Sequence, residues 1–130
     1  MCSSDLSALR NDFAYLNLLL AAKLPESRQT AEELVGQFPE SLPYRTTLAL
    51  ACYRLKDYTT ALRVYEGRPY DWRQALPGHR AVYAAVLAAN GQGKEAREQA
   101  VHIPPERLRE EELALIRRFS DNQPKSKAGD

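Results

Sequence analysis

Two stretches of sequence decide the fold: residues 57–65, DYTTALRVY, and residues 92–100, QGKEAREQA. In the first, Ala61 stands four residues before Tyr65, and the same spacing recurs 35 residues later (96 − 61 = 35) at Ala96 and Ala100. Small side chains on one face allow two antiparallel helices to approach closely, so each stretch is expected to open the second helix of a hairpin. The sequence therefore predicts an all-α fold built from helical hairpins.

The apolar pattern divides the rest of the chain into helices that end at prolines, glycines and capping residues. They are expected at residues 6–23, 28–38, 42–55, 58–66, 78–90, 94–101 and 109–119. Leu24 and Pro25 are expected to end the first helix, and Ser27 and Asp57 to cap the second and the fourth. Three hairpins and a final helix follow from this pattern, and the final helix is expected to act as a cap.

The first predicted helix is apolar on two sides. One stripe carries Leu9, Phe13, Leu16 and Leu20, and a second carries Leu6, Tyr15, Leu18 and Leu19. A helix of this kind needs neighbours on both sides, and the next hairpin covers only one of them. We therefore expect Leu18 and Leu19 to meet a preceding repeat, a second copy of the chain, or another protein.

Composition limits the classes of function. The chain has 130 residues, 44% of them hydrophobic, which predicts one domain over residues 1–119 and a disordered tail over residues 120–130. With 18 Lys plus Arg against 17 Asp plus Glu, the net charge of +1 favours neither nucleic acid nor an anionic membrane. No apolar run approaches the roughly 20 residues that cross a bilayer. Cys2 and Cys52 have no pairing spacing, so we expect reduced thiols and a cytoplasmic location.

The third and fourth predicted helices together resemble a unit of the tetratricopeptide repeat (TPR) family. The residues that carry this resemblance are Leu48, Ala49, Cys52, Ala61 and Tyr65. A weaker unit follows through Tyr83, Ala84, Leu87, Gly91, Ala96 and Ala100. The sequence departs from the family where Arg45 and Arg80 replace a large aromatic residue and where Gly67 shortens a helix. A Sel1-type or half-a-TPR array is the neighbouring alternative.

The resemblance implies a right-handed superhelix of about three hairpins whose concave groove holds a peptide or a helix from another protein. The chain would then be a protein-interaction scaffold that forms the C-terminal part of a repeat array. The groove residues Tyr53, Arg54, Arg80 and Tyr83 are candidates for partner binding. Tyr70 and Trp72 form a second candidate site in an irregular loop, because exposed aromatic residues often anchor interfaces. Alternatively, Trp72 only covers the seam of the hairpin.

No catalytic or metal site is expected. Cys52 falls in a buried position of the repeat pattern, and neither His79 nor His102 has a nucleophile at a recognisable spacing. The acidic run Glu110–Glu112 points in three directions around a helix and cannot converge on one ion. The sequence therefore predicts a non-enzyme without cofactor. The alternative function is a regulatory module that holds a peptide or a small apolar molecule near Tyr53, Trp72 and Tyr83.

Overall fold

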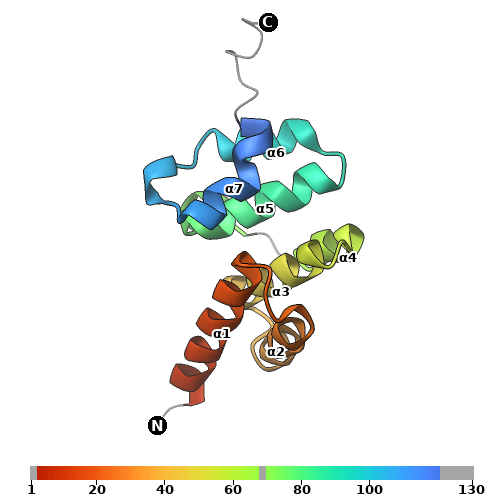
Figure 1. Cartoon of the computed structure of the whole chain (residues 1–130), viewed down its shortest axis with the longest axis vertical. Coiled ribbons are helices and arrows are strands. Elements are labelled where there is room, and N and C mark those ends of the chain that lie inside the picture. Colours follow the sequence, from red (N-terminus) through yellow and green to blue (C-terminus); the bar gives the residue numbers. More distant parts are fainter. Residues whose placement is uncertain (1–2, 68–69, 121–130) are drawn as a thin grey trace, which may run out of the picture. The chain divides into compact units, whose positions relative to one another are not determined.

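The computed structural model describes residues 3–67 and 70–120. Within these ranges the chain forms seven α-helices and two short 3-10 helices, without a strand, which confirms the all-α prediction (Figure 1). The α-helices are α1 (Ser3–Leu19), α2 (Leu24–Gln37), α3 (Leu42–Arg54), α4 (Tyr58–Arg63), α5 (Pro77–Ala89), α6 (Gly93–Ala100) and α7 (Glu110–Ser120), and the 3-10 helices are Trp72–Gln74 and Pro105–Arg107. None of the described helices is long and apolar enough to cross a membrane. Apart from Ser120, the predicted C-terminal tail lies outside the described residues.

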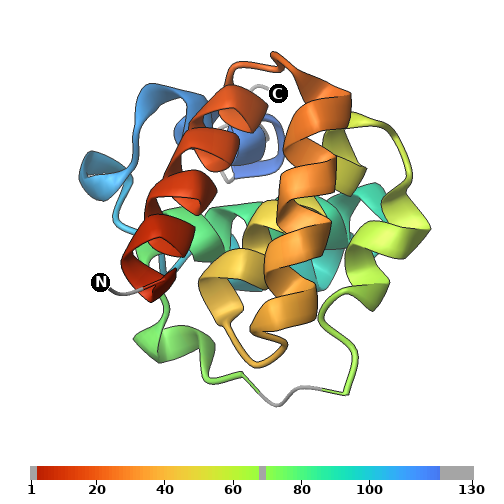
Figure 2. The same ribbon diagram turned by 90° about the horizontal axis from the view of Figure 1, so that it is seen from below.

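The chain divides into two compact units, Met1–Tyr70 and Asp71–Asp130. In the first unit α1 and α2 lie side by side (Figure 2), and α3 packs against α1, α2 and α4. The buried residues of α3 are Thr46, Thr47, Ala49, Leu50, Ala51 and Cys52, so this helix forms the centre of that unit. In the second unit α5, whose residues 81–89 are all hydrophobic, packs against both α6 and α7.

Capping explains why α3 and α4 begin where they do. The backbone N–H of Tyr44 donates to the Ser41 hydroxyl over 3.2 Å, and that of Thr60 donates to the Asp57 carboxylate over 3.4 Å. Pro43 lies in the first turn of α3, where its missing N–H leaves no hydrogen bond unmade. The predicted start of both helices and the capping role of Asp57 are confirmed.

Three predicted boundaries are wrong. The first helix ends at Leu19 instead of residue 23, because Ala21 adopts a left-handed conformation with φ 56°. The second begins at Leu24, with Pro25 in its first turn, and Ser27 is a buried residue within it instead of its cap. The α-helix expected at residues 58–66 ends at Arg63.

The three hairpin turns share one backbone motif. The left-handed residues Ala21, Lys56 and Gly91, with φ of 56°, 66° and 80°, follow one another at intervals of 35 residues. In each turn the next residue donates its N–H to a carbonyl five residues back, over 2.8, 2.8 and 2.9 Å, and the acceptors are Asn17, Cys52 and Leu87. This arrangement is a Schellman motif. A shift of 35 residues therefore relates the hairpins α1–α2, α3–α4 and α5–α6.

Candidate functional site

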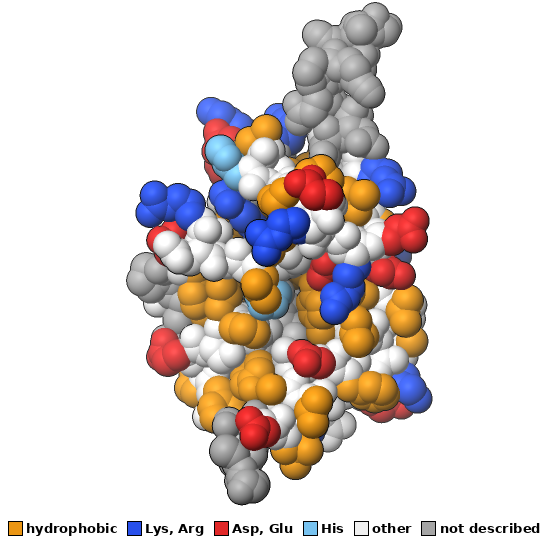
Figure 3. Space-filling view, turned by 90° about the vertical axis from the view of Figure 1, so that its left-hand side faces the viewer, with side chains coloured by type: hydrophobic (Ala, Val, Ile, Leu, Met, Phe, Trp, Pro, Cys, Tyr) orange, Lys and Arg blue, Asp and Glu red, His pale blue; other side chains and the backbone are white. Residues whose placement is uncertain are grey.

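An apolar stripe on α1 is open to solvent. Its members are Leu6, Leu9, Phe13, Leu16 and Leu20, which are 60%, 66%, 65%, 41% and 63% exposed. They are spaced by three and four residues in alternation, which places the first four along one face of α1; Leu20 directly follows the helix and continues the row, with its N–H bonded to the Leu16 carbonyl. Hydrophobic side chains gather over α1 in the lower part of Figure 3. We call these five residues the α1 stripe and take it as the candidate site, because contiguous exposed apolar surface is typical of docking sites.

The prediction that Leu18 and Leu19 form the outward face of the first helix is wrong. Leu18 is fully buried and Leu19 is 4% exposed, whereas the stripe from Leu9 to Leu20 faces solvent. Both stripes are equally apolar, so periodicity alone does not say which one enters the core. The signal that was missed is residue size. The buried side of α1 also carries Ser7, Asn11 and Ala14, whose small side chains allow α2 and α3 to approach closely.

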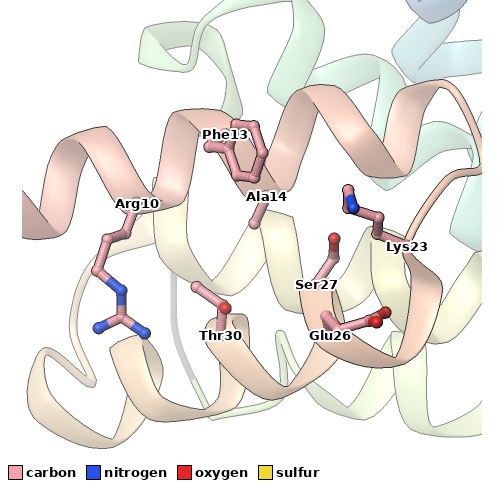
Figure 4. A pocket seen from close by; sticks show the side chains of 7 residues that line it. All are labelled: Arg10, Phe13, Ala14, Lys23, Glu26, Ser27 and Thr30. Carbon is pink, nitrogen blue, oxygen red and sulfur yellow. The ribbon is translucent and has the colours of Figure 1, made fainter.

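A small pocket adjoins the α1 stripe at Phe13. It has a volume of about 110 Å³ and lies between α1 and α2 (Figure 4). Its lining consists of Arg10, Phe13, Ala14, Lys23, Glu26, Ser27 and Thr30. Thr30 stands 35 residues before Tyr65, whose ring is 6% exposed and whose hydroxyl donates to Thr46 over 3.4 Å in the second hairpin. We attribute the pocket to the small Thr30 side chain at a position where the second hairpin carries an aromatic ring.

Charged side chains border the α1 stripe on both edges. Asp5 and Asp12 are exposed and lie seven residues apart, which places them on one edge. On the other edge, the Arg10 guanidinium donates to the Glu33 carboxylate of α2 over 2.7 Å. The Asp5–Asp12 edge therefore presents negative charge, while the cation of the opposite edge is already paired.

The predicted groove residues of the first unit pack within that unit. Arg54 donates from Nε to the Leu18 carbonyl over 2.7 Å and from Nη2 to the Leu19 carbonyl over 2.9 Å. These carbonyls belong to the last turn of α1, where carbonyl groups have no N–H donors within the helix. The half-buried Tyr53 ring lies 5.6 Å from that of Tyr58. Arg54 therefore holds α1 against α3.

The two residues of the predicted loop site, Tyr70 and Trp72, each pack against another aromatic ring. Trp72 stacks on Tyr83 with ring centroids 4.1 Å apart and planes 5° from parallel, and both side chains are half-buried. Burial raises the pKa of the Tyr83 phenol. Tyr70 belongs to the first unit, where it meets the Tyr65 ring edge-on at 6.3 Å. The structure thus brings Trp72 together with Tyr83.

Arg80 links the two helices of the third hairpin. Its Nε donates to the Gln99 amide oxygen over 2.6 Å, and burial lowers its pKa. Arg45, 35 residues earlier, donates from Nη1 to the Val64 carbonyl over 2.6 Å. In both hairpins an arginine of the first helix bonds to the residue 19 positions later. The two arginines that depart from the TPR pattern therefore connect the paired helices.

The described residues hold no group of three His, Cys, Asp or Glu side chains placed to bind a metal ion. Within the acidic run of α7, Glu112 is buried and accepts a hydrogen bond from the backbone N–H of Arg109 over 2.9 Å. A glutamate in the first turn that bonds back to the residue before the helix stabilises the helix start. Glu112 thus stabilises the start of α7.

Cys52 is a fully buried core residue, as predicted. Burial raises the pKa of its thiol, against the opposing effect of the nearby Arg28 guanidinium. Because the thiolate is the reactive form, we expect Cys52 to react with a disulfide reagent at least tenfold more slowly in the folded chain than in urea. The measurement uses a Cys2→Ser background at pH 8. Equal rates in the folded and unfolded chains would contradict the burial of this thiol.

Comparison of the chain with protein-family models, with curated proteins and with solved structures finds no match in any of the three.

Proposed function

We propose that this chain is a protein-interaction module that binds a helix or peptide of another polypeptide through the α1 stripe. The observation that carries the proposal is the exposure of five large apolar side chains, between 41% and 66%, in one row on a helix whose opposite side is packed in a core. Apolar residues scattered singly over a surface need no explanation, but a continuous row of them favours an interface. In this proposal the chain is not an enzyme.

A TPR-like organisation is part of the proposal. Its support is the recurrence of one turn motif at intervals of 35 residues, together with the burial of the small residues Ala49, Ala61, Ala84 and Ala96 where paired helices meet. Helical hairpins that repeat at this interval bury their apolar faces by stacking on one another. The right-handed superhelix and the place of the chain at the end of a longer array belong to the same proposal.

The expected strength of binding follows from the exposed surface. Complete burial of a large apolar side chain is worth about 1.5–3 kcal/mol, so covering the exposed half of five of them contributes on the order of 5 kcal/mol. Association itself consumes much of this gain. We therefore expect the partner to add contacts beyond the α1 stripe. The alternative function, binding of a small apolar molecule, has less support, because the pocket of about 110 Å³ between α1 and α2 holds little more than one side chain and is not lined by Tyr53, Trp72 or Tyr83.

A photo-crosslinking experiment tests the proposal. Benzoyl-phenylalanine replaces Phe13 in the full chain within cells of the source organism, and the same group at Val101 is the matched control. Val101 is 67% exposed, close to the 65% of Phe13, but it follows α6 in the second unit. We expect an adduct with protein from Phe13 at a yield at least fivefold above that from Val101. Equal yields at both positions would contradict a docking role for the α1 stripe.

A further inference from the structure

The identity of the occupant can be inferred from the repetition within the first unit, on the premise that the proposed function is correct. We infer that the α1 stripe receives an amphipathic helix of the α2 type, which lies antiparallel along α1 as α2 lies along α3. Such a helix belongs to a partner protein.

The 35-residue shift relates the α1 stripe to a face of α3 that is buried at Ala51, half-buried at Tyr44 and Leu48, and 38% exposed at Leu55. From Leu9 onward, the stripe residues correspond to Tyr44, Leu48, Ala51 and Leu55. On α3 this face meets α2: the Phe38 ring contacts that of Tyr44 edge-on at 5.5 Å, and Ala51 is fully buried. On α1 the same helix face is the exposed one. The occupant of the α1 stripe is therefore expected to take the place that α2 takes on α3.

The differences between the two faces specify the occupant. Leu16 stands where α3 has Ala51, so the helix that covers α1 needs a small residue at this contact. The pocket beside Phe13 is large enough for one side chain of the occupant. Along the edge formed by Asp5 and Asp12, basic residues seven positions apart on the occupant would complement the two carboxylates. The predicted partner is a helix with small and large apolar residues on one face and a basic edge.

A second copy of this chain fits the α1 stripe less well. In an antiparallel pair of α1 helices centred on Phe13, Asp12 of the two copies would come close together, and like charges at such a contact repel. In a parallel pair, the cation nearest to Asp5 would be Arg10 of the other copy. The Arg10 guanidinium already forms an ion pair with Glu33 at 2.7 Å. Helix α7 of a second copy could not cover the α1 stripe as α2 covers α3. The exposed residues of α7 are Glu110, Ala114, Arg117 and Arg118, which include no large apolar side chain.

A tandem chain tests the inference. An additional copy of residues 6–40 is inserted directly before Leu6, so that the added second helix precedes α1 by the same distance as α2 precedes α3. We expect hydrogen exchange of the α1 amides to slow at least tenfold relative to the parent chain. The control tandem carries Phe13→Glu and Leu16→Glu in the original α1 and should exchange like the parent. Both positions are exposed in the parent, so the same pair in that chain should leave exchange unchanged.

A second tandem carries Leu16→Ala in the original α1, so that this position has an alanine, as α3 has at Ala51. Without this variant, a Leu16 side chain that is too large for the added helix could prevent the two helices from packing and conceal the interaction. The inference is overturned if neither tandem slows exchange, or if the control tandem slows it equally. A dimer of the parent chain in sedimentation velocity that dissociates with Phe13→Glu would also overturn it, in favour of a second copy. That result would leave the proposed function intact. The proposed function itself fails only if Phe13 and Val101 crosslink to protein equally.

Discussion

Gly78→Ala is expected to lower the free energy of unfolding of the second unit by about 2–3 kcal/mol, the upper part of the range for overpacked sites. A Cβ on Gly78 would collide with the Glu112 carboxylate, which is buried and fixed by the hydrogen bond from Arg109. Relief would require Glu112 to leave the position in which it stabilises the start of α7. Urea unfolding followed by the fluorescence of Trp72, the single tryptophan of the chain and a member of this unit, measures the effect.

Gly36→Ala is the matched control for this experiment. Gly36 lies in α2 and a Cβ there would meet no atom within 4 Å, so alanine should raise stability by about 0.5–1 kcal/mol. The Glu112→Ala substitution removes the carboxylate, so in that background Gly78→Ala should lower the free energy of unfolding by less. The effects of the two substitutions are therefore expected to be non-additive. If Gly78→Ala costs the same in both backgrounds, the collision with Glu112 is not the cause.

Arg54→Ala is expected to destabilise the first unit by about 2 kcal/mol. The substitution removes two short hydrogen bonds from a guanidinium to the last carbonyls of α1, and hydrogen bonds to charged groups contribute about 1.5–3 kcal/mol. We also expect faster hydrogen exchange of the α1 amides, because Arg54 connects that helix to α3. Urea unfolding followed by far-UV circular dichroism, together with hydrogen exchange, measures both effects.

Two further variants show whether the geometry of Arg54 matters. Arg54→Lys keeps the charge but cannot donate from two fixed nitrogens, so it should recover only part of the stability. Arg63→Ala, at an exposed position of α4, should change stability by less than about 0.5 kcal/mol. Equal losses for Arg54→Ala and Arg63→Ala would mean that Arg54 contributes only general charge.

The local signals in the sequence predict most of the secondary structure. Asp57 caps α4, as its residue type predicts, and α3 and α5 each begin with a proline in the first turn, where proline is tolerated. The error at the end of α1 arises from Ala21. A turn with a left-handed residue is easily predicted at Gly91 but not at an alanine, because only glycine adopts positive φ without steric strain. The repeat interval of 35 residues was visible in the small residues, and the turns extend it to the first hairpin.

For the candidate site, the sequence alone determined that the first helix is apolar on two sides, because helical periodicity is a local property. Only the tertiary structure decided which side remains open. The packing of α2 and α3 selected the side with Leu18 and the small residues, since burial depends on how closely neighbouring backbones approach. For the same reason Arg54 was predicted as a binding residue: the sequence shows an exposed type of side chain, but the carbonyls that it binds lie 35 and 36 residues away.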